Sequence, residues 1–123
     1  TGAATTTVAR NKIYNLSSSN ANANTFGINV TSGTTVNLNN NVIGDLRAPS
    51  ANAANPVVGL NISGGTTINA SFNTVRLNAS STGALFGSSA VSASTAPNVT
   101  LRNNNLVNLS TASGAGLIAA YRR

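Results

Sequence analysis

The sequence contains no cysteine, methionine, tryptophan or histidine, and its only acidic residue is Asp45. The lack of cysteine excludes a disulfide scaffold and thiolate metal sites. One carboxylate cannot provide the pair of carboxyl groups that hydrolyses a glycoside, nor the set of oxygen ligands that Ca²⁺ prefers. We therefore expect a protein that is not an enzyme, with no catalytic residue, metal or cofactor. Asp45 and Arg47 are predicted to form a surface ion pair.

Long apolar runs are also missing, and none approaches the roughly 20 residues that a membrane-spanning helix needs. We therefore predict no membrane span. The seven basic residues give a formal charge of +6, but they are scattered along the chain, and Tyr14 and Tyr121 stand alone. Nucleic-acid binding calls for clustered charge with aromatic platforms, so no nucleic-acid partner is predicted. The positive charge fits two alternatives, solubility or attraction to an acidic polysaccharide.

The main positive feature is an internal repeat. Residues 27–43 return as residues 59–75 and, more loosely, as residues 90–106, and residues 6–13 form an opening half-copy. Asn11, Asn41, Asn73 and Asn104 hold the same place in each copy, at successive steps of 30, 32 and 31 residues. A fixed period of this size is typical of a solenoid.

Within each repeat, apolar residues alternate with polar ones, which predicts strands with every second side chain in a shared interior. Gly, Ser, Thr, Asn and Pro fill the intervening segments and favour turns over helix. The predicted core columns stack equivalent residues of successive repeats. They are Val8, Leu38, Ala70 and Leu101; Val36, Ile68 and Val99; Ile13, Ile43, Val75 and Leu106; and Ile28, Leu60, Val91 and Leu117.

The chain is expected to form one β-helix segment over residues 1–123, with coils at approximately 6–35, 36–67, 68–98 and 99–123. Each coil would hold three short strands, and length variation is confined to one loop per coil, at residues 17–25, 47–57, 78–89 and a shorter loop after Leu109. No capping helix is predicted at either end. The sequence begins in mid-pattern and contains no methionine, which favours a segment of a longer protein.

The repeat V-x-L-x-N-N-x-I, followed by a loop and G-I-x-V, resembles right-handed parallel β-helix repeats of the pectate-lyase-like fold. Such repeats occur in many bacterial secreted and surface proteins. The resemblance implies that Asn11, Asn41, Asn73 and Asn104 stack at a corner, each side-chain amide bonding to the next coil. A turn asparagine exposed to solvent is the alternative for each of them.

Outward-pointing residues should also stack in rows. The first predicted strand gives Thr7, Asn37, Asn69 and Thr100, with Thr35 and Thr67 in the neighbouring row. These hydroxyl and amide groups form a candidate ligand face, and solvent-facing strand residues are the alternative.

Three functions remain open. The first is a structural segment of an extracellular or cell-surface protein that stacks end to end into a rod or fibre, on copies of itself or on adjacent coils of a longer chain. The second is an adhesin or carbohydrate-binding module. The third is a fragment of a polysaccharide-degrading enzyme whose acids lie elsewhere.

Overall fold

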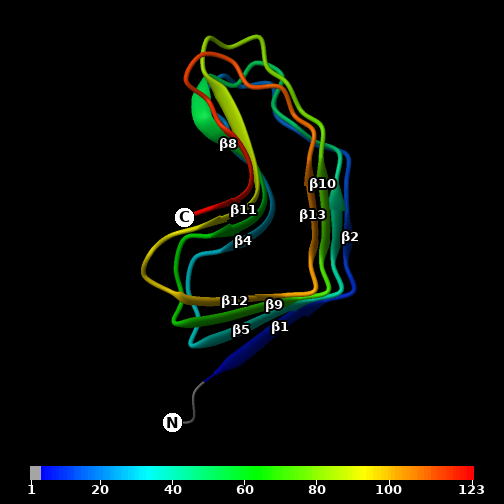
Figure 1. Ribbon diagram of the computed structural model, residues 1–123, viewed down its shortest axis with the longest axis vertical. Helices are drawn as coiled ribbons and strands as arrows, with labels where there is room; N and C mark the ends of the chain where they lie inside the picture. Colours follow the sequence, from blue (N-terminus) through cyan, green and yellow to red (C-terminus); the bar gives the residue numbers. More distant parts are fainter. Residues whose placement is uncertain (1–3) are drawn as a thin grey trace.

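The computed structural model describes residues 4–123, and this part of the chain contains strands and turns but no helix. The chain winds through about four coils, and strands of successive coils pair in parallel (Figure 1). The predicted parallel β-solenoid is therefore confirmed. Residues 1–3 of the predicted segment lie outside the described residues.

Three sheets of four strands form the walls of the solenoid. The first sheet consists of β1 (Thr5–Ala9), β5 (Thr35–Asn39), β9 (Thr67–Ser71) and β12 (Asn98–Arg102). The second consists of β2 (Lys12–Ile13), β6 (Val42–Gly44), β10 (Thr74–Leu77) and β13 (Asn105–Asn108). The third consists of β4 (Thr25–Val30), β8 (Ala53–Ile62), β11 (Phe86–Ala93) and β14 (Ile118–Arg122). Each coil contributes one strand to each sheet, so coil one lies at one end of the stack and coil four at the other.

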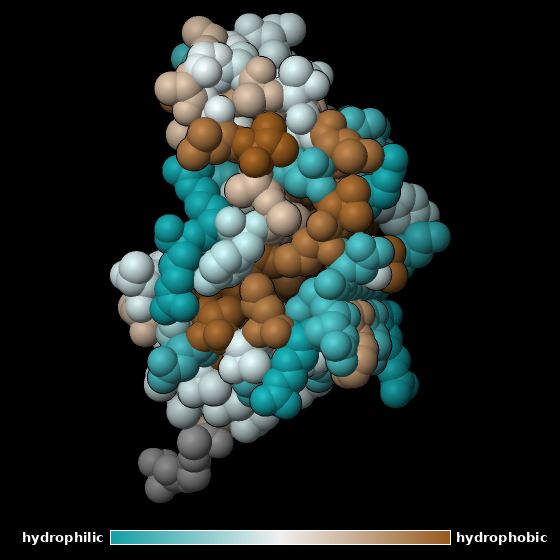
Figure 2. Space-filling view, viewed as in Figure 1, coloured by the Kyte–Doolittle hydropathy of each residue, from teal (hydrophilic) through white to brown (hydrophobic). Residues whose placement is uncertain are grey.

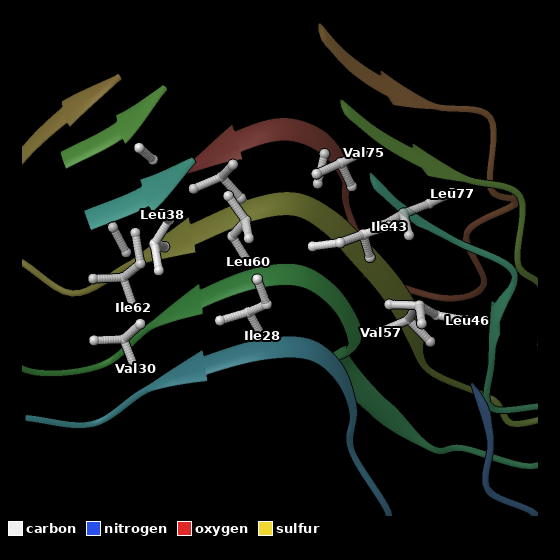
Figure 3. Packing of buried hydrophobic residues seen from close by; sticks show 14 of the residues in the cluster. Ile28, Val30, Leu38, Ile43, Leu46, Val57, Leu60, Ile62, Val75 and Leu77 are labelled. Carbon is white, nitrogen blue, oxygen red and sulfur yellow. The ribbon is translucent and has the colours of Figure 1, made fainter. Parts of the chain in front are cut away.

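The strand registers place the alternating apolar residues in vertical columns. Val36 pairs with Ile68, which pairs with Val99, and Leu38 pairs with Ala70. In the second and third sheets, Ile43 aligns with Val75, and Ile28 aligns with Leu60 (Figure 3). Successive side chains of a strand point to opposite faces, so one face of every strand enters the core.

The prediction that Leu117 belongs to the core is wrong. Its side chain is 62% exposed, because Leu117 precedes β14 and joins the sheet only through its carbonyl oxygen, which accepts from the backbone N–H of Ser88 at 3.0 Å. The residue opposite Val91 is instead Tyr121. The fourth member of this column is therefore an aromatic residue in coil four.

Coils one and two contain a fourth short strand that the sequence did not predict. These strands are β3 (Leu16–Ser17) and β7 (Leu46–Arg47), and they pair with each other. Asn15 and Asp45, which precede them, have positive φ angles of 60° and 49°. This left-handed backbone, which Asn and Asp tolerate better than most residues, turns the chain before each strand. In coil three no residue from Thr74 to Leu77 has a positive φ angle, so β10 continues to Leu77 as a single strand.

The predicted loops of coils two and three are shorter than expected, because the third-sheet strands extend into them. β8 begins at Ala53 and β11 begins at Phe86. Phe86 is fully buried and is the largest side chain of the core. Phe86 therefore extends the core and does not cover a sheet from outside.

Candidate functional site

The single acidic residue lies on the surface, in the predicted ion pair. Arg47 Nη1 lies 3.0 Å from Asp45 Oδ1, and both side chains are about half exposed, at 47% and 48%. Arg47 also donates to the side-chain oxygen of Asn15 in coil one. Residues 4–123 enclose no pocket and contain no cluster of metal-ligating side chains. The candidate sites are therefore surfaces and ends of the stack.

The four repeated asparagines form a ladder at the corner between the first and second sheets. The Nδ2 of Asn11 donates to Asn41 Oδ1 at 3.0 Å, Asn41 Nδ2 donates to Asn73 Oδ1 at 2.9 Å, and Asn73 Nδ2 donates to Asn104 Oδ1 at 3.0 Å. The same three oxygens accept from the backbone N–H groups of Asn11, Asn41 and Asn73, at 3.1, 3.1 and 2.9 Å. Asn41 and Asn73 are completely buried. The ladder satisfies polar groups that would otherwise be costly to bury.

The ladder has a direction, because every rung donates toward coil four. Asn104 uses one Nδ2 hydrogen on the carbonyl of Ala70, at 2.9 Å. Within residues 4–123, its backbone N–H and its second Nδ2 hydrogen meet no acceptor, and Asn11 Oδ1 meets no donor. In the described part of the chain, coil four thus presents two donors without an acceptor, and coil one presents an acceptor without a donor in the matching place.

The candidate ligand rows are arranged on the first sheet as the repeat predicted. Thr7 pairs with Asn37, then Asn69 and Thr100, while Thr35 pairs with Thr67. Asn69 Nδ2 donates to Asn37 Oδ1 at 3.0 Å, and Asn61 makes the same bond to Asn29 on the third sheet at 2.8 Å. These amides are therefore partly occupied with one another. Nothing in the geometry of the described residues, beyond this alignment, distinguishes the rows as a binding site.

The basic residues are less scattered in space than along the sequence. Arg10, Lys12, Arg76 and Arg102 all lie on the exposed side of the molecule formed by the second sheet and its corner with the first. In addition to Tyr14, this side of the molecule carries a second aromatic residue, Phe72. This grouping is not visible in the sequence, because these residues lie in different coils. Only the pairing register between coils brings them to one face.

Comparisons of the chain with known protein families, curated proteins and solved structures gave no significant match. Among the described residues, no helix has the length and apolar character required to cross a membrane.

Proposed function

We propose that this chain is a non-catalytic structural segment that stacks end to end into a rod or fibre. The place we propose for it is the exterior of a bacterial cell, on a secreted or surface protein with a right-handed, pectate-lyase-like β-helix. The observation that carries the proposal is the complementarity of the two ends. Asn104 offers donors where Asn11 offers an acceptor, so a further coil continues the ladder in either direction.

The rest of each end supports the same contact. β1 and β12 are the edges of the first sheet, β2 and β13 of the second, and β4 and β14 of the third, so each end carries unpaired backbone groups. Such edges readily pair with another strand. Figure 2 looks along the stack and shows apolar side chains in the middle of the end face, ringed by hydrophilic ones. Stacking would cover this apolar centre and place Val8 over Leu101.

The contact joins two different surfaces, so it does not close on itself as a symmetric dimer does. A head-to-tail contact repeated without closure produces an open rod. Copies of this chain would therefore add at either end while keeping the same direction throughout.

Introducing a charged residue at either end of the ladder tests this arrangement. Asn104→Asp keeps the oxygen that accepts from Asn73 but presents a carboxylate to the acceptor Asn11 of the next copy. Asn11→Lys keeps a donor toward Asn41 but presents an ammonium to the donors of Asn104. Each variant alone is expected to stay monomeric in analytical ultracentrifugation, because like groups meet at the contact.

The double variant Asn11→Lys/Asn104→Asp is expected to assemble, since the introduced ammonium meets the introduced carboxylate. A mixture of the two single variants should assemble too. Far-UV circular dichroism controls for folding of each variant. If the unaltered chain remains a compact monomer at high concentration, end-to-end stacking is wrong. If it assembles but both single variants assemble equally well, the ladder does not form the contact.

A second function, an adhesin or carbohydrate-binding module, is favoured by the hydrogen-bonded amide rows of the first sheet. Their flat array would suit the hydroxyl groups of a sugar chain. Retention on an immobilised polysaccharide, lost in the variant Asn37→Trp/Asn69→Trp, would support this function. The absence of retention on a broad panel of glycans would remove it.

A further inference from the structure

The corner and the second sheet together form an exposed face with an ordered pattern of side chains. Its outward positions form three columns, each read from coil one to coil four. The corner column is Arg10, Asn40, Phe72 and Asn103; the middle column is Lys12, Val42, Thr74 and Asn105; the third column is Tyr14, Gly44, Arg76 and Val107. We call these twelve positions the corner face.

Three large apolar side chains cross the corner face on a diagonal. Tyr14 lies in coil one, Val42 in coil two and Phe72 in coil three, each one column further toward the corner. They are 58%, 48% and 57% exposed, which makes them three of the seven most exposed large apolar residues in the described chain. This diagonal, which we call the apolar strip, lies on a wall of the solenoid, away from the ends that stack.

Cations flank the strip on both sides. Arg10 and Lys12 lie on the coil-one side, and Arg76 lies on the coil-three side, all exposed. Arg102 adds a fourth charge at the neighbouring edge of β12. The chain's only acidic residue, Asp45, is held by Arg47 at 3.0 Å. The corner face is thus positive without side-chain carboxylates to offset it.

The backbone conformation of Phe72 is a second indication that the strip has a function other than folding. All four residues of the corner column have left-handed backbone, with φ angles of 60°, 55°, 59° and 51° from coil one to coil four. Asparagine, found in coils two and four, tolerates this conformation, whereas a bulky aromatic residue is strained in it. Phe72 adopts this strained conformation although its side chain stays exposed. Strain retained without a packing benefit points to a functional surface.

We propose that the corner face docks on an anionic phospholipid surface. Exposed aromatic and aliphatic side chains enter the headgroup region, while lysine and arginine side chains pair with the lipid phosphates. The solenoid would lie with its long wall on the membrane, and its stacking ends would stay free.

A single-stranded nucleic acid fits the same face less well. Bases stack on open aromatic surfaces, but Lys12 Nζ already lies 5.0 Å from the centre of the Tyr14 ring. Val42, in the middle of the strip, has no ring to stack on. A lipid surface makes use of all three apolar side chains and of the cations around them.

Binding of the full chain to vesicles tests the proposal. Co-sedimentation is expected with phosphatidylglycerol-containing vesicles, and at least tenfold weaker binding with pure phosphatidylcholine. Added salt should weaken the binding to anionic vesicles. The double variant Arg10→Gln/Lys12→Gln should bind roughly 25-fold more weakly, from about fivefold for each charge removed. The matched control Arg122→Gln/Arg123→Gln removes the same charge elsewhere and should change binding by less than about twofold.

The apolar strip is tested separately. Phe72→Asn introduces the residue already present in coils two and four, so it preserves the fold and should weaken vesicle binding by about tenfold or more. Phe72→Trp gives a single reporter in a chain without tryptophan, and its emission should shift to the blue on anionic vesicles.

Equal binding to neutral and anionic vesicles would overturn the proposal. So would an equal loss in the face and control variants, because net charge alone would then explain the binding. Binding to a single-stranded oligonucleotide, with the same pattern of losses and no vesicle binding, would reassign the face to nucleic acid.

Discussion

In coil two Leu38 and Ile43 are fully buried, whereas their counterparts in coil one, Val8 and Ile13, are only partly covered. Core residues of coil three are likewise more deeply buried than their counterparts in coil four. Residues of similar type in the same register differ in burial because inner coils have a neighbour above and below. A coil of this kind cannot bury its own core, so the stability of each one depends on the coils beside it. The difference can be sharpened by matched substitutions in inner and outer coils.

The largest effect is expected from truncating an inner core leucine. Leu60→Ala leaves a cavity in coil two, between Ile28 of coil one and Val91 of coil three, and should lower the free energy of unfolding by about 3 kcal/mol. Leu101→Ala, in the outer coil, should cost only about 1 kcal/mol, because Leu101 is half-buried and solvent can fill the space. Urea denaturation followed by circular dichroism measures both. Equal costs would mean that the outer coil is covered in solution, as stacking would require.

A smaller contrast is expected within the asparagine ladder. Asn73→Ala removes the acceptor for two donors of Asn41 and should cost about 2 kcal/mol, because buried polar groups lose their partners. Asn104→Ala leaves Asn73 near the solvent-exposed end, so water can replace the lost acceptor, and about 1 kcal/mol is expected. The urea midpoint of each variant is compared with that of the unaltered chain, in solutions dilute enough for the protein to be monomeric. A larger loss for the outer asparagine would contradict the ladder's dependence on burial.

The smallest expected effect is a gain. Phe72→Asn should raise the free energy of unfolding by up to about 1 kcal/mol, since it relieves left-handed strain at an exposed site. The reverse substitution, Asn40→Phe, places the same strain in coil two and should lower stability by a similar amount. Thermal melting of both variants measures the pair. A loss of stability in Phe72→Asn would show that the ring contributes to packing.

Much of this architecture was predictable from sequence, because alternation and a fixed period are direct consequences of stacked strands. The recurrence of asparagine at one phase predicted the ladder without any coordinates. Leu117 was misplaced because it has the same alternation phase as Tyr121, four residues later, and is the larger aliphatic candidate for the column. Only the strand register, in which Val91 pairs with Tyr121, shows that Leu117 comes too early in the chain to fill that place.

The corner face could not have been predicted from the period alone. Tyr14, Val42 and Phe72 occupy different positions of the repeat, so aligning the repeats places them in separate columns. They become neighbours only through a diagonal across three coils, which requires the left-handed corner and the register on both sides of it. The sequence signal that could have indicated it is Phe72 itself, an aromatic residue where coils two and four have asparagine.

The ladder also has a consequence for the length of the molecule. Each inner coil receives from one neighbour the same bonds that it donates to the other, so a duplicate of residues 36–67 inserted after Thr67 would find its partners already in place. Such an insertion would lengthen the body by about 4.8 Å and leave both terminal surfaces unaltered. Overall length can therefore change, one repeat at a time, without redesigning how successive molecules meet.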